Sequence, residues 1–532
     1  MSSGAPKWPK HPARCVAFGR MPARRFPCGA RIVAAFALLL AALLLIAGCG
    51  GSSSSASRAG PDPASVAPAH AALYAEATIR PSGDLKAGVL AAARKVLRVQ
   101  DPGAALRRLL DRDASGGIRF SRDIEPWLGP RVGAFMLTPA TGAREPDWGV
   151  AIAIGNSKAF DAAQPRLRRT QRPAGSYRGV RYVRDNSGRS YAARVGDFYV
   201  LATLTGLRAA IDASSGSSLA DASRYTDAVK AVPDAAIAFA YADASALMPT
   251  LARAKVPPAA RAALAGLARS PIVASLTANA DQIAIEGTGE TQLGSSGSSK
   301  ATVSIGQLPG DAWLALATPP LGPLIKQALD SAGVHNQVAA RVRARLGLDL
   351  DRDLLDPLGG LGAYASGQTV LDLSGGALLQ FTDAASAQRL LTRLQTVLAA
   401  GAHLPVAPAS SGSARGFQVQ IAQSPQPIVV LAQGDKLAAG YAASSAKELL
   451  HPRRRFDDSS AAKAALGTLG DGYTASFVLI VPPVVGLLRA LDELEVAKLS
   501  PVIPYVQAYR SLAIGTKRNG DRTTVRIVAA LR

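Results

Sequence analysis

Two serines stand at a spacing that could support covalent catalysis. Ser444 and Ser460 each precede a lysine by three positions, and serine acyl-enzymes need a lysine one helical turn from the nucleophile. The SDN and KTG segments that complete such a site are absent from the sequence. We therefore predict that Ser444 caps the N-terminus of a helix and that neither serine is catalytic.

Three alternating aspartates resemble the start of a calcium loop. They are Asp349, Asp351 and Asp353. The loop requires glycine at its sixth position and glutamate at its twelfth, where this sequence has Leu354 and Gly360. A capped turn is the better interpretation of these aspartates.

The histidines after the N-terminal leader show no metal-ligand spacing. We expect His335, His403 and His451 to lie on the surface, and His70 to lie in a linker. The glycine-rich stretch Leu358–Gly362 lacks the lysine of a phosphate-binding loop. The sequence predicts no catalytic residue, no metal site and no cofactor.

One residue does carry a strong chemical signature, and it is Cys49. The first 31 residues are basic without any acid, and the uncharged apolar run Ile32–Ala47 follows. This layout is that of a secretory signal peptide. The run ends in Ile46-Ala47-Gly48-Cys49, which resembles the bacterial lipobox. We predict cleavage before Cys49 and lipidation of its thiol.

This interpretation predicts a lipoprotein on the outer face of a bacterial cell membrane. Residues 1–48 would be the signal peptide, and residues 49–70, rich in Gly, Ser, Ala and Pro, would be a flexible tether. The alternative is an uncleaved anchor helix, although the apolar run is shorter than the ~20 residues of a typical span. Translation could start at Met1 or Met21. Both alternatives place the rest of the chain outside the cytoplasm.

The chain is strongly basic, with a formal net charge of +22. Such a charge often indicates a nucleic-acid partner, but export argues against one. The local basic clusters are Arg166, Arg168, Arg169 and Arg172, and then Arg453, Arg454 and Arg455. Each cluster could be a solvated helix end or loop, or could attract anionic lipid or cell-wall polymer.

The sequence contains an internal repeat. Short matches recur in the same order along the chain: Asp123-Ile124 with Asp353-Leu354, Leu128-Gly129 with Leu358-Gly359, Gly196-Asp197 with Gly434-Asp435, and Asp281 with Asp521. We predict two homologous halves, residues 71–290 and 311–532, joined by a linker at 291–310.

Each half is expected to have an α+β fold. Val132–Leu137 and Val150–Ile154 read as buried strands, and Tyr191–Val195 and Phe198–Ala202 as a hairpin turning at Gly196-Asp197. A helix should follow Ser157. Short turns imply antiparallel pairing. We predict, in each half, an antiparallel sheet with helices packed on one face.

These features resemble the bacterial domain-of-unknown-function family 3352. The residues that carry the resemblance are Leu73-Tyr74-Ala75-Glu76, Asp123 to Gly129, and Gly196-Asp197-Phe198-Tyr199-Val200. The resemblance implies an exported or membrane-anchored protein. It implies no activity and no site residue, because the family has none established.

Two functional hypotheses remain open. The first is a non-enzymatic envelope module that binds a lipid, polymer or protein, with a cleft between its halves or an apolar groove near Phe477–Val485. The second is a cell-envelope hydrolase whose site is assembled from distant residues. Polar residues gathered in a concave site that differs between the halves would favour the hydrolase.

Overall fold

The computed structural model describes residues 59–532, except 113–116, 140–144, 247, 249–269, 291–300, 370, 402–403, 422–423 and 496. Cys49, His403 and most of the predicted signal and tether lie outside the described residues. No described helix is long and apolar enough to span a membrane.

Within the described residues, the first half of the chain contributes ten strands, and its helices alternate with them along the sequence. Its elements are η1 (Pro63–Val66), β1 (Leu73–Thr78), α2 (Gly83–Leu97), α3 (Pro102–Arg112), the π-helical turn η2 (Phe120–Ile124), β2 (Leu128–Met136), β3 (Trp148–Ile154), α4 (Ser157–Leu167), η3 (Arg168–Thr170), β4 (Gln171–Tyr177), β5 (Val180–Asp185), β6 (Tyr191–Val195), β7 (Phe198–Ala202), α5 (Leu204–Ser215), η4 (Leu219–Asp221), α6 (Ser223–Val229), β8 (Ala236–Ala242), β9 (Ile272–Ala278) and β10 (Gln282–Glu290).

The second half follows the same kind of order. Its elements are η5 (Ile305–Gln307), β11 (Leu314–Ala317), α9 (Leu321–Ala332), α10 (His335–Leu346), η6 (Leu350–Leu355), β12 (Leu358–Ser366), β13 (Ser374–Phe381), α11 (Ala384–Gly401), β14 (Val406–Ser411), β15 (Ala414–Val419), β16 (Ile428–Gln433), β17 (Lys436–Tyr441), α12 (Ala442–Leu450), η7 (Phe456–Asp458), α13 (Ser460–Gly467), β18 (Thr474–Ile480), α14 (Val481–Glu493), α15 (Ile503–Val506), β19 (Tyr509–Asn519) and β20 (Arg522–Leu531).

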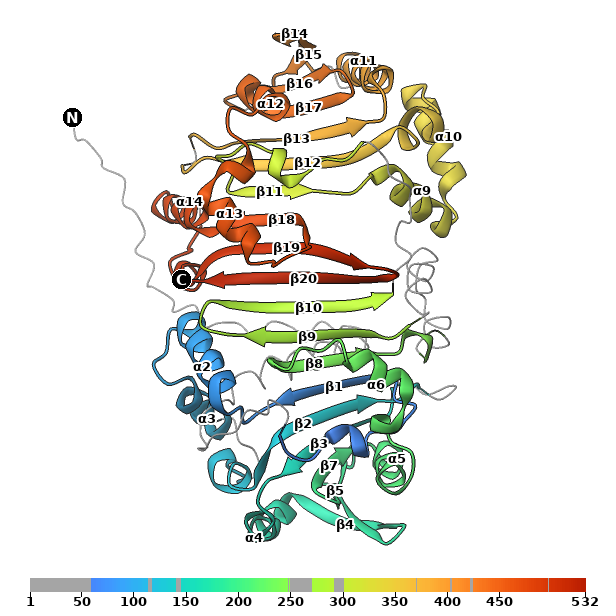
Figure 1. Ribbon diagram of the computed structural model, residues 1–532, viewed down its shortest axis with the longest axis vertical. Coiled ribbons are helices and arrows are strands. Elements are labelled where there is room, and N and C mark those ends of the chain that lie inside the picture. The colour runs from blue at the N-terminus through green and yellow to red at the C-terminus, as the bar shows by residue number, and fades with distance from the viewer. Residues whose placement is uncertain are drawn as a thin grey trace, which may run out of the picture.

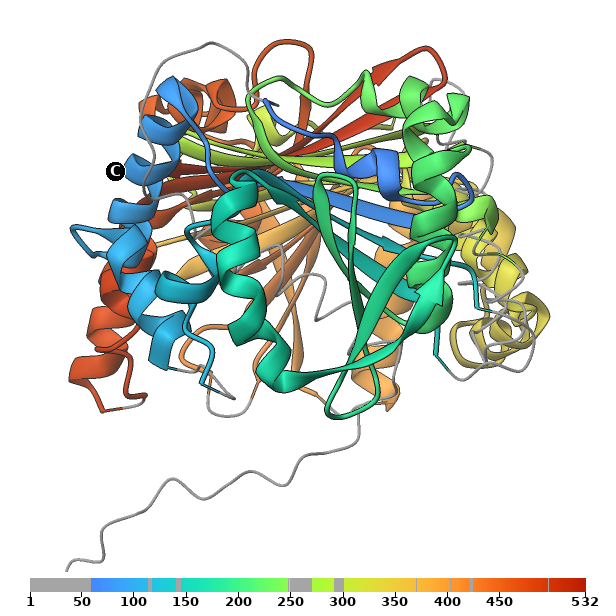
Figure 2. The ribbon, with the colours of Figure 1, turned by 90° about the horizontal axis from the view of Figure 1, so that it is seen from below.

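All twenty strands join one antiparallel sheet (Figure 1). The pairings give the order β4-β5-β6-β7-β3-β2-β1-β8-β9-β10-β20-β19-β18-β11-β12-β13-β17-β16-β15-β14. Strands β10 and β20 pair along their whole length, from Gln282 opposite Ala530 to Glu290 opposite Arg522. The two halves therefore share a continuous sheet, whose twist fans the strands in the end-on view of Figure 2.

The helices cover both faces of this sheet, so the prediction of helices on one face is wrong. In β7, Phe198 and Val200 belong to a cluster with α5, while Tyr199 between them belongs to a cluster with α4. Successive side chains of a strand point to opposite faces, so both faces are packed. The continuous apolar run of β7, which lacks polar alternation, is what a strand covered on both sides requires.

The predicted tether extends too far along the chain. Asp62 caps η1 by accepting a hydrogen bond from the backbone N–H of Ala64, and Ala64, Val66 and Ala67 are buried in the core. Small residues suit this segment because it runs directly over the sheet. The linker predicted at 291–310 is shortened in the same way, because η5 is buried in the second half.

The local predictions for strands and turns are confirmed. The hairpin β6–β7 turns at Gly196-Asp197, and the hairpin β16–β17 turns at Gly434-Asp435. Both glycines have positive φ, +57° and +56°, which glycine adopts without steric cost. The last hairpin, β19–β20, turns at Gly520 with φ +59°. The predicted helix forms as α4, but the prediction that Ser157 caps it is wrong, because Asn156 is the N-cap and accepts a hydrogen bond from the backbone N–H of Ala159.

Candidate functional site

A hollow of about 630 Å³ opens in the first half, between α4 and the hairpin β4–β5. We call it the α4 cleft. Helix α4 contributes Phe160, Asp161 and Gln164 to its lining, and β7 contributes Tyr199. The other lining residues come from η3 and from strands β4 to β6: Arg168, Gln171, Pro173, Gly175, Arg181, Tyr182, Val183, Ala192, Ala193 and Arg194.

Two aromatic rings, Phe160 and Tyr199, line the base of the α4 cleft, and Trp127 packs against both of them. The ring centroids of Trp127 and Phe160 are 5.1 Å apart, those of Phe160 and Tyr199 are 5.4 Å apart, and those of Trp127 and Tyr199 are 5.9 Å apart. All three side chains are buried. Edge-on contacts of this kind add to the stabilisation from burial, so the base of the cleft is rigid.

Asp123 fixes the position of these rings from below. Its backbone carbonyl accepts a hydrogen bond of 2.7 Å from Trp127 Nε1. Its carboxylate is fully buried and accepts hydrogen bonds from Arg122 at 2.8 Å and from Arg166 at 2.6 Å. The hydrogen bond from Arg122 is the main reason that the pKa of Asp123 lies far below its usual range. Arg166, from the predicted basic cluster, is thus a structural residue.

Hydrogen-bond donors of the α4 cleft remain available to a ligand. The Tyr199 hydroxyl accepts a hydrogen bond of 2.8 Å from Gln171 Nε2, and burial raises the pKa of Tyr199, so the hydroxyl keeps its proton. Within the described part of the chain, that proton has no acceptor, and the guanidinium groups of Arg168 and Arg181 have no hydrogen-bond or ion-pair partner.

Arg194 is already engaged. Its guanidinium lies 5.8 Å from the centroid of the Phe160 ring and 3.5 Å from Asp161, the only carboxylate among the lining residues. The cleft therefore combines an aromatic base, one internal ion pair and two unpaired arginines. Such an arrangement can bind an organic anion.

The corresponding region of the second half is filled with apolar side chains. Counting from the helix N-caps Asn156 and Asp383, the position of Gln164 is taken by Leu391. The registers of the hairpin strands give four further correspondences between the halves. Phe417 takes the position of Val183, Val430 that of Ala192, Ala432 that of Arg194, and Leu437 that of Tyr199. These residues belong to one buried cluster. The cleft thus depends on particular side chains of the first half.

A family model described as "Protein of unknown function (DUF3352)" matches residues 31–531. The chain belongs to this family. The family residues noted in the sequence have structural roles in the described fold: Tyr74 and Glu76 take part in a buried hydrogen-bond network, Asp123 and Trp127 support the α4 cleft, and Gly196 makes a turn.

Solved structures with similarity to this DUF3352 chain include crystal forms of TP0453. Crystal forms III and I have TM-scores of 0.25, sequence identities of 10% and 9%, and cover 45% of this chain and 84% and 82% of theirs. Crystal form IV has a TM-score of 0.17 and an identity of 11%, covering 74% of this chain and 98% of its own. These TM-scores are too low to transfer a fold or a function. No curated protein matches the chain.

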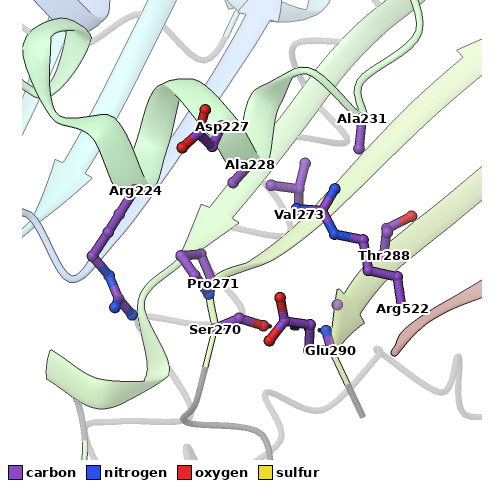
Figure 3. A pocket seen from close by; sticks show the side chains of 11 residues that line it. Arg224, Asp227, Ala228, Ala231, Ser270, Pro271, Val273, Thr288, Glu290 and Arg522 are labelled. Carbon is purple, nitrogen blue, oxygen red and sulfur yellow. Dashed lines mark hydrogen bonds between the residues drawn. The ribbon is translucent and has the colours of Figure 1, made fainter. Parts of the chain in front are cut away.

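A smaller polar hollow of about 210 Å³ lies where the two halves of this DUF3352 chain join (Figure 3). Arg224 and Arg522 approach it from opposite sides. Arg224 is paired with Asp243 at 3.1 Å, and Asp227 with Lys230 at 2.7 Å. The continuous β10–β20 pairing leaves little room here, so the predicted cleft between the halves is this small hollow.

Ser444 lines a third hollow, of about 430 Å³, with Glu448 and Arg453. Ser444 lies inside helix α12, which begins at Ala442, so the prediction that Ser444 is an N-cap is wrong. Glu448 forms an ion pair of 3.1 Å with Arg453, a member of the second basic cluster. Ser460 is the first residue of α13.

The aspartates of the second half pair with basic groups and backbone. Asp349 caps η6 by accepting a hydrogen bond from the backbone N–H of Arg352, which confirms the capped turn. The hydrogen bond from Arg352 is the main reason that the pKa of Asp353 is lowered to about 2. The described residues contain no group of three metal-binding side chains.

His335 lies at the surface but is partly covered, because its side chain is 16% exposed. Its Nδ1 lies 2.5 Å from Asp330 and its Nε2 lies 2.9 Å from Asp351. His70 and His451 are exposed. The hydrogen bonds to Asp330 first, and then to Asp351, raise the pKa of His335, so the protonated ring links α9, α10 and η6.

We expect the substitution His335→Gln to lower the melting temperature more at about pH 5.5 than at about pH 9. A raised folded-state pKa gives stability that is fully present below the unfolded pKa and lost as pH rises through the folded pKa. Calorimetry across this range measures the difference, with His451→Gln at an exposed position as the control. A difference that is constant with pH would contradict the role of the charged ring.

The apolar run Phe477–Val485 forms the strand β18 and the start of helix α14, as predicted. Pro482 is near the beginning of the helix, where the missing N–H is tolerated. Val478 and Val481 are buried, and Val485 packs with Ile503 in a small cluster. Ile480 is also buried, whereas Pro482 is exposed and the remaining residues of the run are partly buried. The run is therefore packed in part against the rest of the chain.

Proposed function

We propose that the chain is a non-enzymatic binding module of the cell envelope, attached to the outer face of the membrane by lipid on Cys49. The α4 cleft is its binding site. The observation that carries the proposal is the open cleft with two unpaired arginines, at a position that the second half fills with Leu391, Val430 and Leu437. An open concave surface that combines apolar and charged side chains is the usual form of a ligand site, which favours a function for it.

The polar residues of the α4 cleft differ between the halves, a feature that we expected of a hydrolase. The lining residues nevertheless include no serine, cysteine or histidine, and Asp161 is their only carboxylate. General acid–base catalysis requires a titratable group that can reach the proton it moves. Asp161 is 66% exposed and paired with Arg194, so this set of side chains suits binding better than turnover.

The hydrolase alternative rests on the hollow of α12. Ser444 and Glu448 both line it, together with Tyr364 and Asp372, so a nucleophile and carboxylates share one concavity. Glu448 is held by Arg453 on its side chain and also accepts a hydrogen bond from the Arg453 backbone N–H. This second candidate function would place the site in the second half.

A substrate screen separates the two candidate functions. The detergent-purified full chain is incubated with peptidoglycan, ester and phosphoester substrates, and with a fluorophosphonate probe of serine nucleophiles. We expect no saturable turnover and no labelling of Ser444 or Ser460. The binding proposal is wrong if turnover is saturable and is abolished by Ser444→Ala or by a substitution in the α4 cleft. Ser459→Ala, which removes a hydroxyl that does not line the hollow of α12, is the control.

We also propose that the two halves arose by duplication. Supporting this, the pairings from β4 to β10 recur in the same order from β14 to β20. The N–H groups of Ala72 and Trp313 both bond to the next strand, at the carbonyls of Met136 and Ala365, so Ala72 and Trp313 occupy equivalent positions before the first strand of each half.

A further inference from the structure

We propose that the α4 cleft binds the phosphate group of an organic phosphate ester, held by Arg168, Arg181 and the Tyr199 hydroxyl, while the organic part packs beside Pro173 and Val183. This inference rests on the proposed function of the cleft as a binding site. It goes further by naming the chemical class of the ligand and the side chains that select it.

The charge balance of the cleft favours an anion. Three arginines and one carboxylate line it. Because Asp161 is paired with Arg194, the two remaining guanidinium groups are uncompensated. A planar guanidinium can donate two parallel hydrogen bonds to oxyanions, and its pairing with phosphate or carboxylate is among the strongest polar contacts in proteins.

The directions from which donors approach favour phosphate over carboxylate. Arg168 comes from the end of α4, Arg181 from β5 and Tyr199 from the base of the cleft on β7. A carboxylate offers two coplanar oxygens, whereas a tetrahedral phosphate ester offers several oxygens pointing in different directions. Donors that line one cleft from three different elements can therefore each meet a different oxygen of a phosphate group.

The size of the cleft favours an organic ester over the inorganic ion. Its volume of about 630 Å³ lies in the range of roughly 300–1,000 Å³ that holds organic ligands. The exposed side chain of Pro173 and the partly buried side chain of Val183 provide apolar surface beside the donors. A ligand that combined phosphate with an apolar or ring-shaped part would use both surfaces.

Comparison with the second half predicts one site per chain. Ala432 and Leu437 stand at the positions of Arg194 and Tyr199, and Gln395 stands at that of Arg168 when both are counted from the N-cap of the helix. Arg415 stands at the position of Arg181, but its guanidinium donates to the backbone carbonyls of Gly412 and Ala414. At these positions the second half therefore lacks the tyrosine hydroxyl, an unpaired guanidinium and the space.

Titration calorimetry on the detergent-purified full chain tests the inference with three probes. They are dihexanoyl phosphatidylglycerol below its micellar concentration, the uncharged dihexanoylglycerol, and inorganic phosphate. We expect one site per chain for phosphatidylglycerol, no detectable binding of dihexanoylglycerol, and at least tenfold weaker binding of inorganic phosphate. If inorganic phosphate binds as tightly as the lipid, the phosphate class stands and the source of the ligand is a soluble phosphate.

Matched pairs of variants separate a built site from general attraction. The pair Arg168→Gln and Arg181→Gln should weaken phosphatidylglycerol binding at least tenfold. The pair Arg169→Gln and Arg172→Gln removes the same charge from exposed neighbours that do not line the cleft, and should change affinity less than twofold. Equal losses from both pairs would overturn the inference, because they would indicate a diffuse basic surface.

A variant that fills the cleft provides an independent test. Gln164→Leu with Val183→Phe introduces the residue types found at Leu391 and Phe417 in the second half, and should abolish binding while keeping the melting temperature. Tight binding of dihexanoylglycerol that this variant abolishes would overturn the phosphate inference and leave the proposed binding function intact. Absence of binding for every probe, with no ligand copurifying, would contradict both.

Discussion

The variant Arg131→Leu is expected to lose about 3–5 kcal/mol of the free energy of unfolding, because it leaves a buried carboxylate without its charge partner. Arg131 on β2 is 6% exposed, and Glu76 beside it on β1 is 3% exposed. Arg131 Nε donates a hydrogen bond of 2.8 Å to Glu76 Oε1, and Nη2 of the same side chain lies 2.9 Å from Asp62. The guanidinium thus fastens η1 to the sheet.

The pH dependence of this loss has a definite sign. Burial raises the pKa of Glu76, and the charge of Arg131 opposes that rise. Without Arg131 the pKa of Glu76 in the folded state rises further above its value in the unfolded chain. The folded variant then tolerates the neutral carboxyl group, and it loses stability as pH rises through this raised pKa and the buried group ionises. The destabilisation should therefore be smaller at about pH 5 than at about pH 8. Urea unfolding at both pH values measures it.

The double variant Glu76→Leu with Arg131→Leu is the control. It removes the buried charge together with its partner, and apolar replacement of a whole buried pair is far less costly than breaking it. The double variant should be more stable than Arg131→Leu alone, although the Tyr74 hydroxyl loses the acceptor that it has at 2.8 Å on Glu76. Strictly additive single effects would mean that the two charges are not coupled.

The local sequence predicted strands and turns well because both depend on neighbouring residues. The apolar side chains from Phe198 to Ala202 favour a strand, and Gly196 adopts the positive φ that the turn at Gly196-Asp197 requires. The faces of the sheet were harder to predict. A strand covered on both sides reads as uniformly apolar, and nothing within β7 says that α4 packs on one side and α5 on the other.

The α4 cleft was missed because its residues, all between 160 and 199, are spread over several strands and helices and are ordinary in type. Arg168 was noted only as part of a basic cluster, and Arg166 in the same cluster proves to be an internal ion-pair partner of Asp123. One signal was present in the sequence. When the two halves are compared by their helix caps and hairpin turns, Gln164 corresponds to Leu391 and Tyr199 corresponds to Leu437. A polar residue at a position that is apolar in the other half marks a site that is not optimised for packing.

The attachment to the membrane gives the largest expected effect in cells. Replacing Cys49 with alanine should leave an unprocessed chain that retains the basic leader and carries no diacylglycerol. The thiol is the only atom at this position that can form the thioether, and the preceding Ile46-Ala47-Gly48 completes the lipobox. Intact mass and membrane fractionation measure the outcome. Cys28→Ala, which removes a thiol from the same leader, is the matched control and should be processed normally.

The mass of the mature chain decides between a lipid anchor and an uncleaved helix. A lipoprotein begins at Cys49 with added acyl chains, whereas an uncleaved anchor keeps residues 1–48 in both the natural chain and the Cys49→Ala variant. Two acyl chains hold a protein stably at a membrane surface, and few residues separate Cys49 from η1, which is fixed to the sheet by Asp62 and Arg131. The lipoprotein hypothesis is wrong if the Cys49→Ala variant is still cleaved, still fractionates with membranes, and differs in mass from the natural mature chain only by the substitution.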